Sequence, residues 1–341
     1  MPIAKKNTEL TKRITEKLGV KNNTARVYAS LIKQMWLRMS KEATHQNMPA
    51  DMAFLKTTKM KSYVRGIVNL TRRKNHANAA VAALKMVTDE KDVHKQEYRD
   101  IMMAADKDFQ KFLLSGKRQR SFKNAEASWE IVKNAHKKVA RVLNLEGIWR
   151  EGEHVDHTQY KKLMAFIYFK WLADSSPRRL EYTDTRFVAA DEYKKLTDEQ
   201  KDQSNWVVMD KVWTWEVRKY KTRSTYGPVS IKIGRGLKAA LRKILPITSA
   251  KNAQKFIFLN SKWRRLGRNT FSTYIKNWFK TYVRKPWTQN TVRSIRVSAL
   301  YKDAPKTIDM LKLASEMGHD VSTQLLHYRQ EQHGTTTVRT V

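Results

Sequence analysis

The stretch "KVWTWEVRKYKTRSTYGPVSIKI" (residues 211–233) departs most clearly from the pattern of the rest of the chain. Apolar residues alternate with polar ones near both of its ends, and this period of two is typical of β-strands. Gly227 and Pro228 lie between the two alternating runs and favour a turn. We therefore expect a β-hairpin here, with a lysine-rich approach to its turn.

The sequence around this hairpin is predominantly helical in pattern. The 341 residues include only 11 glycines and 7 prolines, and apolar residues recur at helical spacing over long stretches. We predict a mainly α fold with a small β-hairpin or sheet. The expected helices begin near Thr8 and Asn23, and further ones cover residues 58–70, 78–87, 91–114, 125–143, 157–173, 236–244, 270–283, 290–302, 307–317 and 322–330. The segment "KFIFLN" (residues 255–260) is a possible further strand.

A basic break divides the chain into two parts. The segment "LSGKRQRSFKNA" (residues 114–125) contains a glycine and four basic residues, and it predicts a linker that crosses a phosphate backbone. We therefore expect an all-helical domain over residues 1–116, a linker over residues 117–124, and a mixed domain over residues 125–341.

The charge balance indicates a polyanionic partner. Lysine and arginine total 68 against 32 aspartates and glutamates, which gives a formal net charge of +36. This excess is far greater than solubility requires, and it is spread along the chain as on a folded basic surface. A nucleic acid fits best, and an anionic membrane surface is the alternative. The absence of cysteine excludes disulfides, thiolate zinc sites and cysteine nucleophiles.

No segment has the pattern of a membrane span or a signal peptide. The longest apolar run, "LMAFIYFKWLA" (residues 163–173), is much shorter than the ~20 residues that a span needs, and it contains Lys170. The N-terminal segment alternates charges and lacks the apolar core of a signal peptide. We expect an intracellular protein that is associated with DNA.

Common active-site motifs are absent from the sequence. There is no GxxxxGKS/T loop, no GxGxxG after a strand, no HExxH and no GxSxG, and the carboxylates show no pairing suited to a catalytic metal. Cleavage of a phosphodiester without a metal or another cofactor requires a side-chain nucleophile, fixed cations for the non-bridging oxygens, and an acid for the leaving oxygen. Arginine is the favoured cation because its planar fork pairs with phosphate and keeps its charge.

Four stretches supply residues of these types. They are "SSPRRLEY" (residues 175–182), "RKYKTRSTYG" (218–227), "TVRSIRVSAL" (291–300) and "MGHDVSTQLLHYRQ" (317–330). In this order they resemble the signature of the tyrosine recombinases, the phage-integrase family. The sequence motifs "PRR" and "KTxxTYG" are most similar to those of integrases from virophages and large DNA viruses.

The resemblance rests on spacing. The family has an arginine followed three residues later by an acidic residue, and here Arg178 precedes Glu181. The neighbouring Arg179 is the alternative to Arg178. The family also has a lysine on a β-hairpin, which Lys221 matches, with Lys219 or Arg223 as alternatives.

The C-terminal part of the signature follows the same order. The family's HxxR motif is matched by Arg293 and Arg296, with arginine in place of the histidine, and its LGH motif is matched by "MGH" with His319. The family's tyrosine lies nine residues after that histidine, as Tyr328 does here.

The resemblance implies a DNA breaking and rejoining activity. Tyr328 would be the nucleophile that forms a 3′-phosphotyrosyl intermediate, and Lys221 would protonate the leaving 5′ oxygen. Arg178, Arg296 and His319 would hold the non-bridging oxygens, with Arg293 assisting and Glu181 orienting an arginine. No metal, ATP or other cofactor is needed.

The resemblance also implies a fold and partners. The fold would be a two-domain, C-shaped clamp with a helical core-binding domain and a catalytic domain. Its partners would be double-stranded DNA and further copies of the chain, as a tetramer on two DNA sites. Expected DNA contacts are Lys117, Arg118, Arg120, Lys123, Arg264 and Arg265. The alternatives are a monomeric type IB topoisomerase and a non-catalytic DNA-binding protein of the same fold.

Overall fold

The structure is a computed structural model that describes residues 3–39, 43–44, 48–89, 91–114, 129–150, 152–301 and 306–325. The chain divides into two compact units, Met1–Gly116 and Lys117–Val341. The expected linker, with Lys117, Arg118, Arg120 and Lys123, lies outside the described residues. So does Tyr328.

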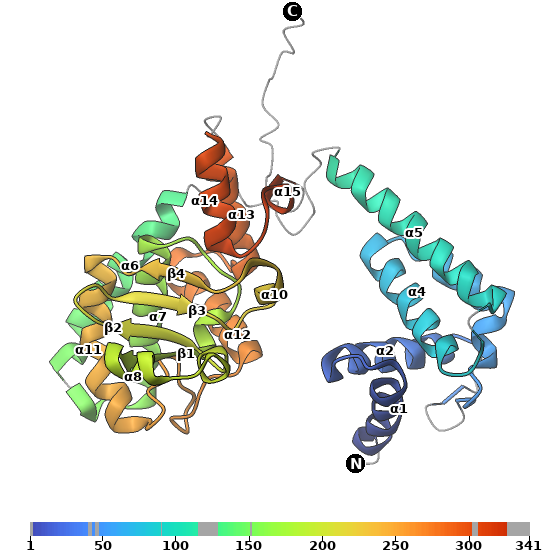
Figure 1. Ribbon diagram of the computed structural model, residues 1–341, viewed down its shortest axis with the longest axis horizontal. Helices are drawn as coiled ribbons and strands as arrows, with labels where there is room; N and C mark the ends of the chain where they lie inside the picture. Colours follow the sequence, from blue (N-terminus) through green and yellow to red (C-terminus); the bar gives the residue numbers. More distant parts are fainter. Residues whose placement is uncertain are drawn as a thin grey trace, which may run out of the picture. The chain divides into compact units, whose positions relative to one another are not determined.

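The described part of the first unit is helical (Figure 1). Its helices are α1 (Ile3–Leu18), α2 (Asn22–Trp36), α3 (Thr58–Arg65), α4 (Leu70–Lys85) and α5 (Val93–Leu114), with a 3₁₀ turn at Ala53–Lys56. The side chains of Thr57 and Asn69 accept hydrogen bonds from the first turns of α3 and α4 and so fix where these helices begin. The single helix predicted over residues 58–70 is therefore wrong, because α3 ends before Gly66 and a new helix starts at Leu70.

The first unit has its own hydrophobic core. Alanines on α4 allow close packing, and the fully buried Tyr98 of α5 donates a hydrogen bond to the Leu55 carbonyl at 2.9 Å. The start of α4, "LTRRKNHA", is too polar to show an apolar stripe, which explains why the prediction placed this helix eight residues too late.

The second unit combines helices with one sheet. Its helices are α6 (Trp129–Leu145), α7 (His157–Asp174), α8 (Ala190–Lys195), α9 (Asp198–Asp202), α10 (Arg223–Tyr226), α11 (Arg235–Lys251), α12 (Arg268–Trp278), α13 (Gln289–Leu300), α14 (Thr307–Met317) and α15 (Val321–Thr323). Its strands are β1 (Thr185–Ala189), β2 (Asn205–Met209), β3 (Thr214–Val217) and β4 (Val229–Lys232).

The sheet contains the predicted hairpin. Its strand order is β1-β2-β3-β4, with β1 and β2 parallel and the other pairs antiparallel. Val217 faces Val229 across the β3–β4 pair, so the hairpin is confirmed, as is the mainly α fold with a small sheet. The segment 255–260 joins β1 only through a single bridge between Arg186 and Phe256, so the possible strand there is wrong.

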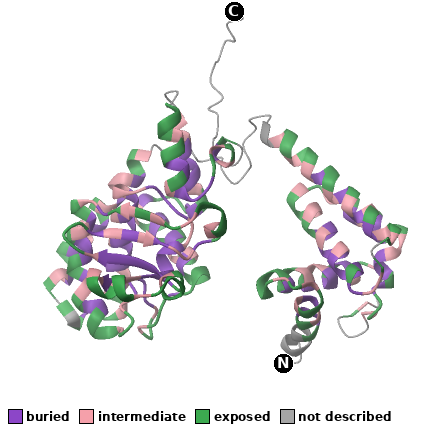
Figure 2. Ribbon diagram, viewed as in Figure 1, coloured by how far each residue is buried: buried purple, intermediate pink, exposed green. Residues whose placement is uncertain are grey.

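The helix α7 forms the centre of the second core. Its buried residues lie on all of its sides, as Figure 2 shows for the interior of this unit. The Tyr160 hydroxyl donates to the Ile257 carbonyl at 2.8 Å, and the ring of Tyr168 packs edge-on against Tyr182 and Phe271. The segment that follows α7 therefore starts from a rigid support. Among the described residues, no helix is long and apolar enough to cross a membrane.

Candidate active site

Buried side chains hold the backbone of Arg178, four residues beyond the end of α7. Its amide N–H donates to the Tyr182 hydroxyl at 3.1 Å, and its carbonyl accepts a hydrogen bond from the Gln289 side chain. Tyr182 stacks in turn on Trp215, with ring centroids 5.2 Å apart. The guanidinium therefore extends from a fixed point in the core.

The guanidinium of Arg178 is fully buried at the end of α14. Its Nη1 donates to the Glu316 carbonyl at 2.5 Å, and its central carbon lies 4.8 Å from the centroid of the Tyr220 ring. Its Nε and Nη2 have no hydrogen-bond partner among the described residues. Burial lowers the pKa of Arg178, and the nearby Glu181 carboxylate opposes that shift. The side chain remains a cation with spare donors.

Arg293 brings a second buried guanidinium to the same place. It lies on α13, is fully buried, and donates from Nη1 to the Met317 carbonyl at 3.3 Å. Figure 1 shows α13 and α14 side by side, with Val297 and Leu313 packed between them. Cations at a helix C-terminus interact favourably with its dipole. Two permanent cations thus meet at the last turn of α14.

Gly318 ends α14, whose bounds match the helix predicted over residues 307–317. It also makes room for these cations. Its φ of +70° lies in the left-handed region that favours glycine. A Cβ atom here would lie 2.7 Å from Nη2 of Arg178 and 3.4 Å from the Tyr220 ring. Glycine is therefore required both by the backbone and by the close approach of Arg178.

His319 follows directly and is buried beside the arginines. Its Nδ1 lies 3.1 Å from the Asp320 carbonyl oxygen, which only accepts, so we assign the imidazole proton to Nδ1. Burial, together with the charge of Arg293, lowers the pKa of His319 to about 4. The imidazole is therefore neutral at pH 7 in the free protein.

The hairpin turn is attached to the same loop. The Thr222 hydroxyl donates to the Gly318 carbonyl at 2.9 Å, and the Tyr226 hydroxyl donates to the Asp320 carboxylate at 3.1 Å. Lys221, next to Thr222, is exposed and has no ion pair among the described residues.

The two alternatives to Lys221 are engaged elsewhere. Lys219 pairs with Asp184 at 3.3 Å, and Arg223 pairs with Asp202 at 3.5 Å. Of the three candidates, Lys221 is thus the one that forms no ion pair among the described residues.

Arg296 does not join this group. One turn along α13 from Arg293, its guanidinium lies 5.3 Å from the Trp129 ring, and Arg296 lines a cavity of about 680 Å³ that Ser176 and Glu316 also line. Lys133, Lys232 and Lys312 line the same cavity. Burial lowers the pKa of Arg296. Of the two arginines matched to HxxR, the one at the histidine position is the one that reaches the Arg178 and His319 cluster.

The remaining predicted residues occupy varied surroundings. Arg179 is half-buried, in contrast to its fully buried neighbour Arg178. Arg264 is exposed, whereas Arg265 forms an ion pair with the buried Asp184. The segment after α15 is described only to Leu325, so the surroundings of Tyr328 lie outside the described residues.

Several residues that shape the site were missed from the sequence. Gln289 holds the Arg178 backbone, and Thr222 and Tyr226 attach the hairpin to residues almost 100 positions later. Thr222 and Tyr226 lie within a stretch that the sequence singled out, but no sequence pattern identifies hydroxyl partners at that separation. Within the described ranges, no three histidine, aspartate or glutamate side chains are grouped so that they could hold a metal ion.

No family model and no curated protein matches the chain. Among solved structures, the fold is similar to one described as the crystal structure of XerA recombinase. The match has a TM-score of 0.40 and 11% sequence identity, and it covers 95% of this chain and 94% of that one.

Proposed function

We propose that this chain breaks and rejoins DNA strands through a covalent tyrosyl intermediate, in the manner of the tyrosine recombinases that its sequence resembles. The observation that carries the proposal is the convergence of distant segments on one turn. Arg178, Arg293 and His319 meet at the end of α14, and the hairpin that carries Lys221 is attached there.

This convergence suits a phosphodiester. The two buried guanidiniums donate to main-chain carbonyls at the end of α14 and lie beside each other there. A diester phosphate carries one negative charge and two non-bridging oxygens, and arginine forks match such oxygens geometrically. Donors fixed in a buried site stabilise developing charge without having to reorganise.

The reaction follows from these groups. The Tyr328 hydroxyl gives its proton to water and attacks phosphorus, the bond from phosphorus to the 5′ oxygen breaks, and that oxygen takes a proton from Lys221. The product is a 3′-phosphotyrosyl link and a free 5′ hydroxyl. Attack by a 5′ hydroxyl of a partner strand reverses the step and reseals DNA. One phosphodiester is exchanged for another at each step, so ATP is not required.

The proposed roles of two residues change from the sequence-based expectation. We now give the second phosphate-binding role to Arg293, since it shares the end of α14 with Arg178, and we remove Arg296 from the reacting group. His319 would enter the reaction neutral, and its pKa would rise when the phosphate binds.

The decisive test is capture of the covalent adduct. A pool of nicked duplexes with randomised sequence around the nick traps the adduct, because the short 5′ fragment diffuses away. We expect a protein–DNA band on a denaturing gel with the intact chain and none with Tyr328→Phe, although both bind the duplex pool equally. Binding without an adduct would instead identify a DNA-binding protein that lacks the chemistry.

A second assay separates recombination from topoisomerase action. The adduct-forming sequence is placed on two duplexes and, separately, on one supercoiled plasmid. Exchange of strands between the duplexes, by an assembly that sediments as a tetramer on two sites, supports a recombinase. Relaxation of the plasmid by a monomer, with no exchange between duplexes, would support a type IB topoisomerase.

A further inference from the structure

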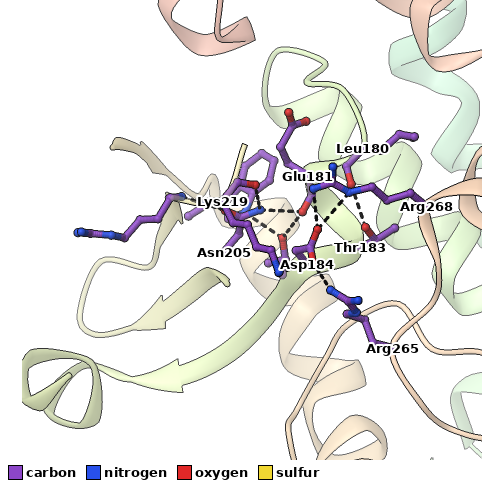
Figure 3. Close-up of polar contacts among 11 residues, drawn as sticks. Leu180, Glu181, Thr183, Asp184, Asn205, Lys219, Arg265 and Arg268 are labelled. Atoms are coloured by element: carbon purple, nitrogen blue, oxygen red, sulfur yellow. Dashed lines mark hydrogen bonds and ion pairs between the residues drawn. The ribbon is translucent and has the colours of Figure 1, made fainter. Parts of the chain in front are cut away.

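A second group of cations surrounds one buried carboxylate. The side chain of Asp184 is 3% exposed, and it accepts hydrogen bonds from Arg268 at 2.8 and 3.2 Å and another from Arg265 (Figure 3). The Lys219 ammonium lies 3.3 Å from the same carboxylate. Three cations thus share a single negative charge.

Rigid segments hold this group together. Asp184 follows Arg178 by six residues, and the Asn205 side chain joins the Glu181 carbonyl at 2.9 Å to the Lys219 amide at 2.7 Å. Figure 3 shows this amide between the two segments. The loop before Arg268 is closed by a hydrogen bond of 2.8 Å from the Leu266 amide to the Phe258 carbonyl.

The charges in the group do not balance. The two arginines already give Asp184 three hydrogen bonds, which is sufficient for a buried carboxylate. Lys219 adds a third cation, so the group carries a surplus of two positive charges that repel each other. The cationic side chains remain 41%, 46% and 50% exposed. They are therefore fixed at one end of the group and open to solvent at the other.

We propose that Lys219, Arg265 and Arg268, positioned by Asp184, bind a backbone phosphate of duplex DNA. We call these four residues the Asp184 clamp. The proposal rests on the proposed function for the identity of the anion. A bound phosphate would offset the surplus charge, and fixed cations lose less side-chain entropy on binding than free surface lysines do. Lys219 precedes Lys221 by two residues, so the clamp contacts the DNA segment that the hairpin approaches.

The Asp184→Asn variant tests whether DNA binding depends on the positioning of the three cations by Asp184 or only on the net charge of the protein. This substitution raises the net charge by one, so an unspecific electrostatic attraction predicts tighter DNA binding. The clamp predicts weaker binding, because the three cations lose their common anchor. We expect a five- to tenfold rise in the Kd for a random duplex at 0.1 M salt, measured by fluorescence anisotropy on protein that melts cooperatively. A lower Kd would overturn the proposal.

Arg268→Gln provides a test that spares the buried carboxylate. Loss of one phosphate contact should reduce the slope of log K against log salt by about 0.9. Lys195→Gln on α8 is the matched control, because Lys195 is exposed, lies in the same unit and removes the same charge. We expect its slope to stay unchanged. Equal slopes for the two variants would refute the clamp, even if Asp184→Asn did not fold.

The clamp and the proposed enzyme can fail separately. All affinities are measured in the Tyr328→Phe background, where binding is observed without chemistry. If the intact chain forms the adduct but the clamp variants bind DNA like Lys195→Gln, only the clamp is wrong. If no adduct forms but the clamp variants lose affinity and salt dependence, the clamp proposal is correct and the chain is a DNA-binding protein without catalytic activity.

Discussion

The second unit gathers cations in two places, and the two groups differ in depth and in partner. Arg178 and Arg293 are fully buried and donate to main-chain carbonyls at the end of α14. The cations of the Asp184 clamp are about half exposed and share a carboxylate. Main-chain dipoles at the end of α14 hold the buried pair, with the Glu181 carboxylate near Arg178, whereas a carboxylate at the centre of the clamp anchors its three cations. The buried pair is therefore suited to one strongly held phosphate, and the clamp to positioning a longer DNA segment.

The difference also has a cost in stability. Burial of a cation is unfavourable by several kcal/mol unless dipoles or opposite charges compensate. At the buried pair the compensation comes from the carbonyl end of α14, with Glu181 near Arg178. The clamp avoids most of this cost because water reaches its cations. Substitutions in the buried pair should therefore change both stability and activity, while those in the clamp should change affinity.

The largest expected effect separates two arginines of α13. Arg293→Gln should reduce the rate of adduct formation by about 10²- to 10³-fold, which is typical of removing one fixed donor from a transition state. Arg296→Gln removes the same charge from the same helix, yet it should reduce the rate by less than about tenfold, because its guanidinium packs on the Trp129 ring whereas that of Arg293 donates to the Met317 carbonyl. Single-turnover kinetics on the trapped duplex measure both. The reverse order would restore the role that the HxxR spacing assigns to Arg296.

The next effect concerns pH, because the buried pair lies beside the titratable His319. Folded His319 has a pKa of about 4 against an ordinary value of 6.5, so between these values the unfolded chain binds the additional proton. The free energy of unfolding should therefore fall as the pH decreases from 7 towards 4, by on the order of 3 kcal/mol in total.

Comparison with His319→Gln isolates this contribution. His76 and His136 also have lowered pKa values and add to the trend in both proteins. The pKa of Asp320 is lowered in the folded state, so protonation of its unfolded carboxyl begins to reduce stability only near its ordinary value of 3.8, and it does so in both proteins. Urea unfolding at several pH values gives the difference between the two proteins. An identical pH dependence would mean that His319 is not desolvated in the folded state.

These expectations show what the sequence could and could not provide. The hairpin and α14 were predictable, because alternation and a terminal glycine are local signals. The strands β1 and β2 were missed, since almost all residues of β2 are buried and no alternation marks it. The family spacing predicted roles for Arg178, Arg293 and His319, which lie together at the end of α14, but it ranked Arg293 below Arg296. Only the packing of α13 against α14 determines which arginine faces the site.

A smaller effect is expected at Gly318. Gly318→Ala places a side chain at φ +70° and a Cβ atom 2.7 Å from Nη2 of Arg178, so the arginine has to shift. We expect a loss of about 1–3 kcal/mol in stability and a lower adduct rate. Gly147→Ala is a suitable control, because Gly147 has a φ of +66° but nothing lies near its Cβ position. Equal rates for the two variants would show that the Arg178 contact is unimportant.

The smallest expected effect tests whether the hairpin is held at the buried pair. Tyr226→Phe removes the hydrogen bond to Asp320 but leaves the half-exposed ring in place. A single exposed hydrogen bond contributes about 0.5–1.5 kcal/mol, so stability should change little. The adduct rate should nevertheless fall about two- to tenfold, because Lys221 would be held less firmly against the leaving oxygen. DNA affinity should remain that of the intact chain, since the clamp is untouched. Tyr274→Phe on α12 removes a hydroxyl from the same unit and should leave the rate unchanged. If Tyr226→Phe lowers affinity rather than rate, the hairpin positions DNA as the clamp does, and Lys221 is not the acid.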